Sequence, residues 1–403
     1  MTAQLTVRPP ALVPGPIRAP KIVVLGLLTR LPFAGVVWQT LHYLEGLRRL
    51  GYDVYYVDAH GSMPLGFFRD DHDDGWQRAA DWLAATMSWM GFAGRWAYAP
   101  QHAGGRRYGL PPGQLAALYR DAALLVNLHG GTEPREELTA SGRLVYLETD
   151  PVQLQVELAE NRPSTITYLD AHAAHFTFAE NAGRPGCRLG VDPRYAFIPT
   201  RQPVLTDHWS TIASPSLPFT TVANWRQTHR NVVYRGETYY WSKHREFGRI
   251  MGLPARVGCA LQLALSKVGP ADRERLTRRG WQVADAAEVS ATPATYHDYI
   301  TSSYGELTVA KDQNVRLQTG WFSDRSATYL AAGRPVITQD TGFAATLPEG
   351  EGLLAFTDLD SAAAAVQLVR GNYRRHATAA RAVAVEHFSS DVVLRDLLRA
   401  VGL

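Results

Sequence analysis

The most informative part of this sequence is Gly320-Trp-Phe-Ser-Asp-Arg-Ser-Ala-Thr-Tyr-Leu-Ala-Ala-Gly-Arg-Pro-Val-Ile-Thr-Gln-Asp-Thr-Gly-Phe343. Ser323 and Asp324 carry side-chain oxygens that can accept the free N–H groups of a first helical turn. The pattern predicts a short helix over 325–332, which a glycine ends. A buried strand over 335–338 and a loop over 339–342 follow, so the stretch has the order typical of an α/β fold.

The start of this helix is suited to binding an anion. Unpaired N–H groups and the helix dipole favour negative charge at a helix N-terminus. Arg325 adds a cation, Ser326 adds a hydroxyl group, and the backbone at Ala327 belongs to the same turn. The loop over 339–342 lies after a strand, where open α/β sheets bind ligands. The stretch therefore predicts a site for a phosphorylated small molecule.

The short helix, the Ala-Gly-Arg-Pro-Val run and the Thr-Gly loop together resemble the donor site of GT-B glycosyltransferases. The resemblance is greatest to bacterial enzymes with Trp-Phe-Ser-Asp-Arg-Ser and Gln-Asp-Thr-Gly-Phe at this point. It implies two Rossmann-like α/β domains that face one another across a cleft. It also implies a nucleotide-sugar donor, linked to UDP, TDP or GDP, and no further cofactor. The resemblance covers most of the chain and is specific over 304–356.

One departure from that family concerns stereochemistry. Many retaining members carry two glutamates eight positions apart, and Gly320 and Thr328 stand at those positions here. Inversion at the anomeric carbon is therefore expected. An inverting transfer needs a base that takes the acceptor proton, and the base should come from the N-terminal domain.

Composition sets the broad class. The chain has 403 residues, of which 46% are hydrophobic and 20% charged, as in a globular protein of two domains. A net charge of +3 without a Lys/Arg-rich run disfavours a nucleic-acid partner. No apolar stretch is long enough to span a membrane. Two cysteines form neither a disulfide framework nor a metal spacing, which favours a cytoplasmic protein.

The N-terminal half has the strand order of a doubly wound domain. Residues 1–20 contain five prolines and no apolar core, so they predict a flexible arm and not a signal peptide. A strand over 21–26, a helix over 36–50 and a strand over 53–57 open the domain, which extends over 21–205. Further strands are expected at 122–128, 143–147, 165–168 and 175–178.

A proline-containing linker over 206–218 leads to a second α/β domain over 219–386. Its strands are predicted at 219–223, 260–264, 281–283, 307–309 and 335–338. Its helices are predicted at 243–251, 271–279, 293–302, 361–369 and 374–387. A last amphipathic helix within 387–403 is expected to cross back onto the N-terminal domain, as the resemblance implies.

Several further residues are candidates for donor binding. Lys311 follows a strand end, where its charge suits a phosphate, although a solvated loop lysine would look the same. Arg226 and Lys243 flank the first loop of the second domain, and Gly35 would allow close approach to the phosphates. The loop residues Gln339, Asp340, Thr341 and Gly342 suit sugar hydroxyls, although Asp-Thr-Gly is also a common turn.

Candidate bases stand at two strand ends of the first domain. His129 precedes two glycines, and its ordinary pKa suits base catalysis near neutrality. Glu148 and Asp150 follow the next strand. Loop capping is the alternative role for each of the three. His172 and His175 lie three apart, but no third ligand accompanies them, so no metal site is predicted.

The function predicted is transfer of a sugar to a small-molecule or polymer acceptor without a metal. Three alternatives remain open from the sequence. One is a nucleotide-sugar epimerase of the same fold. The second is a non-catalytic protein that binds a nucleotide-sugar. The third is a two-domain solute-binding protein, which the lack of a recognisable signal peptide disfavours.

Overall fold

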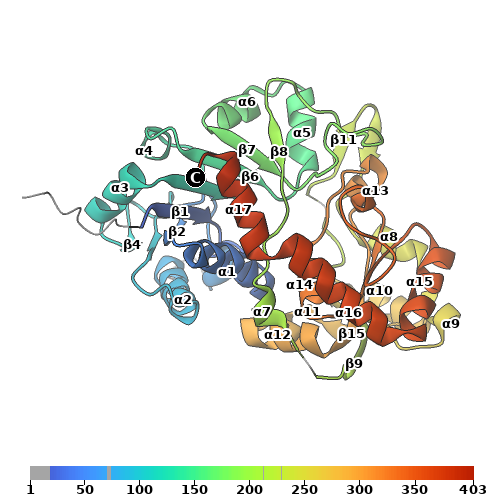
Figure 1. Ribbon diagram of the computed structural model, residues 1–403. Coiled ribbons are helices and arrows are strands. Elements are labelled where there is room, and N and C mark those ends of the chain that lie inside the picture. Colours follow the sequence, from blue (N-terminus) through green and yellow to red (C-terminus); the bar gives the residue numbers. More distant parts are fainter. Residues whose placement is uncertain (1–18, 70–73, 212, 228) are drawn as a thin grey trace, which may run out of the picture.

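The computed structural model describes residues 19–69, 74–211, 213–227 and 229–403. Most of the predicted arm, residues 1–18, lies outside the described residues. The described chain forms two α/β units joined by a linker (Figure 1). Each unit has its own parallel sheet, and helices cover the sheets, so each unit is Rossmann-like.

The first unit is built on an eight-stranded sheet in the order β4-β3-β2-β1-β5-β6-β7-β8. All neighbouring strands run parallel except β3 and β4. The central strands are buried along almost their whole length, because helices cover both faces of the sheet. The strands are β1 (Lys21–Gly26), β2 (Asp53–Asp58), β3 (Trp96–Tyr98), β4 (Tyr108–Gly109), β5 (Leu124–Leu128), β6 (Leu144–Glu148), β7 (Ala174–Thr177) and β8 (Phe197–Pro199).

The helices of this unit confirm one prediction from the sequence and contradict another. The apolar face predicted for the first helix, from Val37 to Leu47, is buried. The strand predicted at 165–168 is instead part of a helix. Its β-branched run looked like a strand, but Pro163 in the first turn favours a helix start. The helices are α1 (Ala34–Arg49), η1 (Leu65–Phe67), α2 (Gly75–Trp89), α3 (Pro112–Asp121), α4 (Glu136–Thr139), α5 (Val152–Ala159) and α6 (Pro163–Asp170).

The second unit contains sheets β17-β16-β15-β9 and β10-β13-β14. A bridge between Phe219 and Leu261 joins them into one parallel layer. Thr221 interrupts the first strand, so the strand predicted at 219–223 is divided in two. The strands are β9 (Leu217–Thr220), β10 (Val222–Asn224), β13 (Gln262–Ser266), β14 (Gln282–Asp285), β15 (Ser303–Thr308), β16 (Val336–Gln339) and β17 (Leu353–Phe356).

The sequence pattern did not reveal the antiparallel hairpin formed by β11 (Val232–Tyr234) and β12 (Glu237–Tyr239). It stands between β10 and the first helix of the second unit. The helices are α8 (His244–Arg249), α9 (Leu253–Val257), α10 (Pro270–Arg278), α11 (Ala286–Val289), α12 (Pro293–Ser302), α13 (Asp312–Leu317), α14 (Asp324–Ala331), η2 (Phe343–Ala345), α15 (Leu359–Gly371) and α16 (Tyr373–Val383).

The end of the chain returns to the first unit. A π-helical turn, Ala384–Phe388, connects α16 to α17 (Ser390–Ala400), which lies along α1 (Figure 1). Gly46 permits this contact, because a Cβ there would be 2.5 Å from Leu394 Cδ1. No helix within the described residues is long and apolar enough to cross a membrane.

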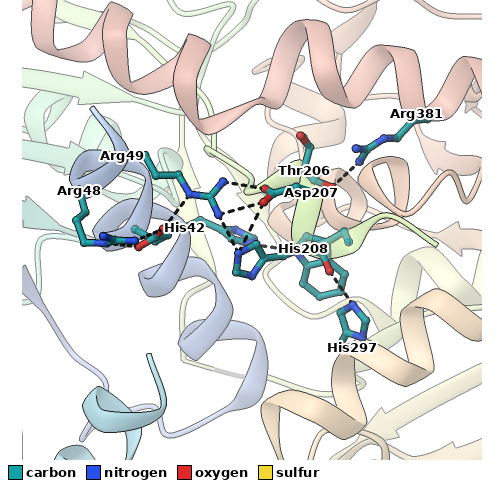
Figure 2. Close-up of polar contacts among 10 residues, drawn as sticks. His42, Arg48, Arg49, Thr206, Asp207, His208, His297 and Arg381 are labelled. Atoms are coloured by element: carbon teal, nitrogen blue, oxygen red, sulfur yellow. Dashed lines mark hydrogen bonds and ion pairs between the residues drawn. The ribbon is translucent and has the colours of Figure 1, made fainter. Parts of the chain in front are cut away.

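Both units hold the linker helix α7 (Thr206–Trp209), as Figure 2 shows. From α1, the Arg49 guanidinium donates to both carboxylate oxygens of Asp207, at 2.9 and 3.0 Å. From α16, the Arg381 guanidinium donates to Thr206 O at 2.6 Å. Trp209 Nε1 donates to His42 Nε2 at 2.9 Å. The linker is therefore anchored at both ends of its helix.

The two units also meet directly, away from the linker. Asn181 N donates to Thr319 O at 3.0 Å, and Arg188 N donates to Leu317 O at 2.8 Å. An apolar cluster lies at the same contact and contains Val152, Val156, Ala179, Leu189, Val232, Tyr234, Tyr239 and Leu317. The carboxyl ends of the two sheets thus face one another, with side chains in contact between them.

Candidate functional site

The candidate site lies where the carboxyl ends of the two sheets meet. Asp150 follows β6 of the first unit, and Lys311 follows β15 of the second. Lys311 Nζ lies 2.5 Å from Asp150 Oδ1 and 3.2 Å from the centre of the Trp241 ring. The lysine side chain is 12% exposed. Two residues predicted on separate domains are therefore brought together, and the hairpin-linked Trp241 covers them.

The pKa values of this pair reflect their burial and mutual charge. Burial would raise the pKa of Asp150, but the Lys311 charge and hydrogen bond and the Arg230 charge lower it overall. Burial lowers the pKa of Lys311, and the Asp150 charge opposes this effect. The pair is stable as an ion pair, so Asp150 is an ionised counter-ion in the ligand-free protein.

His129 follows β5, beside Asp150. Its backbone is left-handed, with φ at 66°, and Gly130 follows with φ at 65°. His129 Nδ1 lies 2.9 Å from Thr149 Oγ1, while no described residue bonds its buried Nε2. Burial lowers the pKa of His129 to about 4, although the Asp150 charge opposes the shift. The imidazole is therefore neutral near pH 7, with one nitrogen unpaired.

Glu148 points into the first unit. Its Oε2 accepts hydrogen bonds from Thr177 Oγ1 at 2.6 Å and Gln155 Nε2 at 3.3 Å. The residue is 1% exposed, and burial raises its pKa to about 8. This carboxyl is protonated at neutral pH and turned toward β7 and α5. Its placement does not fit the predicted role as a base facing the second unit.

The start of α14 has hydrogen-bond donors without partners. Ser323 occupies the N-cap position, but its side chain does not cap the helix, contrary to the prediction. Within the described residues, no hydrogen bond satisfies the backbone N–H of Arg325 or Ser326. The fully buried Ser326 Oγ is also without a partner there. Free donors therefore surround the helix N-terminus, as an anion site requires.

Asp324 does not cap the helix either. Its Oδ1 accepts a hydrogen bond from Gln39 Nε2 of α1 at 2.7 Å. Burial, together with the Asp150 charge, raises the pKa of Asp324 to about 7. The predicted backbone contact at Ala327 does not fit the structure, because Ala327 N donates to Ser323 O within the helix.

Arg325 does not present its charge to a ligand. Its guanidinium donates to Glu306 Oε1 at 2.5 Å, Val222 O at 2.6 Å and Thr308 Oγ1 at 3.0 Å. Glu306 is completely buried in β15. The predicted contact between Arg325 and a diphosphate is therefore replaced by a structural role, because the side chain turns beneath α14 onto the sheet.

Lys243 carries an unpaired amine in this region. No hydrogen bond or ion pair within the described residues satisfies its amine. Burial, followed by the Arg325 charge, lowers its pKa well below the ordinary value, and the charges of Glu306, Lys311 and Asp150 also act on it. This unpaired amine is a candidate for binding an anion. Arg226 differs, because its half-exposed side chain is paired with Asp272 at 2.8 Å.

The loop after β16 is largely occupied by the fold. Gln339 Nε2 donates to the buried Glu246 at 2.5 Å, and Asp340 Oδ1 accepts from Gly342 N at 2.7 Å. Thr341 Oγ1 donates to Trp321 O at 2.7 Å. Gly342 O accepts from Asn181 Nδ2 of the first unit at 2.8 Å. These bonds hold the loop, α8 and the interface, while Gln339 Oε1 has no partner within the described residues, so the predicted sugar contacts stay a prediction.

Gly35 lies in the first turn of α1 and faces Tyr296 of α12. A Cβ there would be 3.4 Å from the tyrosine hydroxyl. The charges of Arg325, Glu306 and Asp324 act on that hydroxyl. Gly35 is therefore near the start of α14, at a point where the two units approach closely.

Sequence reasoning missed residues that organise the site, namely Gln39, Thr149, Asn181, Trp241 and Trp321. Each makes a contact distant in sequence, so no local pattern indicated it. Trp321 lies in the stretch 320–343, yet its hydrogen bond to Thr149 O at 2.9 Å connects the two units. Within the described residues, no three His, Cys, Asp or Glu side chains are arranged to hold a metal ion.

No protein-family model and no curated protein matches the sequence. Solved structures do match over nearly the whole chain. AviGT4, a glycosyltransferase involved in avilamycin A biosynthesis, aligns with a TM-score of 0.53 and 11% identity, covering 94% of this chain and 96% of its own. Anabaena HepE in complex with UDP and glucose aligns at 0.55 and 12% identity, covering 95% and 99%.

A third structure is an alpha-glucosyltransferase in complex with UDP and a 13-mer DNA that contains an HMU base. It aligns with a TM-score of 0.56 and 10% identity, covering 96% of this chain and all of its own. Likeness at this identity concerns the fold. The chain has the GT-B fold, with two Rossmann-like units whose carboxyl edges face each other.

Proposed function

We propose that this protein transfers a sugar from a nucleotide-sugar donor to an acceptor hydroxyl, with inversion at the anomeric carbon. The observation that supports this most is the group of unsatisfied donors at the start of α14. Lys243, Ser326 and two backbone N–H groups lack partners within the described residues. The Asp150 charge of the first unit acts on Lys243 and on Asp324 at the start of α14.

The donor diphosphate would bind at this helix N-terminus. The Lys243 ammonium, the Ser326 hydroxyl and the free N–H groups would stabilise the charge that develops as the nucleoside diphosphate departs. Lys311 would join them by releasing Asp150. The chain thus provides its own cations for the leaving group, and the proposed reaction does not require a metal. UDP is the first nucleotide to test, because similar folds were solved with UDP.

His129 is the base that the geometry supports best. Its neutral imidazole has an unpaired nitrogen. Asp150 also pairs with Arg230 at 3.7 Å, which would remain its partner when Lys311 is released, and Glu148 is turned inward. The acceptor hydroxyl would transfer its proton to His129 Nε2 as its oxygen attacks the anomeric carbon. The bond from that carbon to the diphosphate would break on the opposite side, and inversion follows from this geometry.

The decisive experiment incubates the purified protein with UDP-, TDP- and GDP-sugars, with and without a panel of acceptors. Release of free nucleotide that depends on the acceptor supports transfer. Conversion of the sugar without an acceptor indicates an epimerase, and binding without turnover indicates a non-catalytic binder. NMR of the product must show an inverted anomeric configuration, and EDTA should leave the rate unchanged. A retained configuration would remove the need for a base at His129.

A further inference from the structure

The strained backbone at His129 identifies a place where the fold holds one side chain in a chosen orientation. Histidine can adopt a positive φ, but two successive left-handed residues persist only where neighbouring contacts enforce them. His129 N donates to Leu147 O at 3.1 Å, and Tyr168 Oη donates to Gly130 O at 3.0 Å. The backbone turn is therefore fixed on both sides of the imidazole.

Thr149 determines what the imidazole can do. Its Oγ1 lies 2.9 Å from His129 Nδ1, and the other ring nitrogen has no partner within the described residues. In a neutral imidazole one nitrogen donates and the other accepts. If the hydroxyl accepts the Nδ1 proton, Nε2 keeps its lone pair. If the hydroxyl donates to Nδ1, Nε2 carries the proton and cannot act as a base.

Thr149 is itself held by the second unit. Trp321 Nε1 donates to Thr149 O at 2.9 Å. Trp321, which lies just before the start of α14, therefore fixes the backbone of the residue that orients His129. Trp321 is in turn bound by its own loop, because Trp321 N donates to Thr319 Oγ1 at 3.2 Å and Trp321 O accepts from Thr341 Oγ1 at 2.7 Å. A continuous set of hydrogen bonds thus connects the donor loop to the imidazole.

We propose that Thr149 is a positioning residue that holds His129 in its Nδ1–H form, and that Trp321 makes this depend on contact between the two units. The proposal rests on the proposed function for the use of Nε2 as a base. The proton is retained on Nδ1 and directed to the Thr149 oxygen. Nε2 keeps its lone pair for the acceptor proton only while the second unit is docked.

Nitrogen-15 NMR of the His129 ring tests the tautomer without any assay of activity. The wild type should show the Nδ1–H form. Thr149→Val removes the acceptor at constant shape, so the ring should convert to the Nε2–H form. Thr149→Ser should restore the wild-type spectrum. Thr165→Val is the matched control, because that buried hydroxyl bonds Glu157 on another element. An Nε2–H ring in the wild type, or an unchanged ring in Thr149→Val, would overturn the proposal.

Kinetics give the second readout once a donor and acceptor are known. Thr149→Val should lower kcat at least tenfold with the KM for donor unchanged, and Thr149→Ser should recover most of the rate. Trp321→Phe keeps an aromatic six-membered ring but removes the pyrrole ring with its N–H, so it should lower kcat several-fold. A rise in KM with kcat intact would assign Thr149 to donor binding and overturn the proposal. A chain that transfers no sugar but shows the expected tautomers would contradict the proposed function alone.

Discussion

Among the residues that the structure describes, Lys311 and Asp150 form the closest charged contact between the two units, with Nζ 2.5 Å from Oδ1. The Asp150 carboxylate pairs with the Lys311 ammonium, which the proposed diphosphate would also bind. On the proposed function, a bound donor and Asp150 would compete for one ammonium group. In the ligand-free protein, the same pair holds together the carboxyl edges of the two sheets.

Asp150→Asn should consequently tighten the binding of a nucleoside diphosphate. The carboxylate is 35% exposed, so the pair contributes about 1 kcal/mol at most, which corresponds to roughly fivefold in affinity. Calorimetric titration with UDP measures the change. Unchanged or weaker binding would show that Asp150 does not compete with the ligand. Lys311→Gln is the matched variant and should weaken binding.

Lys243→Met should weaken nucleotide binding and leave the fold at least as stable as the wild type. A charge-assisted contact with phosphate contributes about 1.5–3 kcal/mol, so affinity should fall roughly ten- to a hundredfold. The unpaired amine is costly to the free protein, and methionine removes that cost. Titration with UDP and thermal unfolding together check both effects. Lys21→Met, at the amino end of the central strand β1, should change neither. Lower stability with normal affinity in Lys243→Met would contradict the assignment.

Arg325→Ala should destabilise the protein strongly, because the substitution leaves Glu306 buried without a counter-ion. Breaking a buried pair by removing one partner costs about 3–5 kcal/mol. Urea unfolding measures the loss. The double variant Arg325→Met with Glu306→Gln should recover part of the stability. A stable Arg325→Ala protein that has lost only nucleotide binding would restore the ligand role predicted from the sequence.

His42 should make the protein less stable in acid. Burial, with the nearby His208 charge, lowers the pKa of His42 to about 3 from an ordinary value of 6.5. Between these values the unfolded chain binds the proton and the folded chain does not, so stability is lost as the pH falls below 6.5. At pH 5 the loss is about 2 kcal/mol. Urea unfolding at pH 5 and pH 7 should show a smaller difference in His42→Gln, whereas His102→Gln at an exposed site should behave as wild type.

The sequence alone determined the elements whose patterns are local. The stretch 320–343 predicted the helix and strand now seen as α14 and β16. A helix start, the glycine that ends the helix and a buried strand can each be recognised from a few neighbouring residues. The positions of His129 and Asp150 at adjacent strand ends also followed from the sequence, since parallel strands end at one edge of a sheet. The GT-B fold could be expected from these features and the resemblance.

The tertiary structure decided where the side chains point and what they contact. Arg325 turns inward because its guanidinium pairs with the buried carboxylate of Glu306, which lies 19 residues earlier in the sequence. Asp150 is paired because Lys311 arrives from the other unit, and α6 is helical where its β-branched residues favoured a strand. Such outcomes depend on burial and on charges brought together by folding. Local propensity contains no information about partners over a hundred residues away.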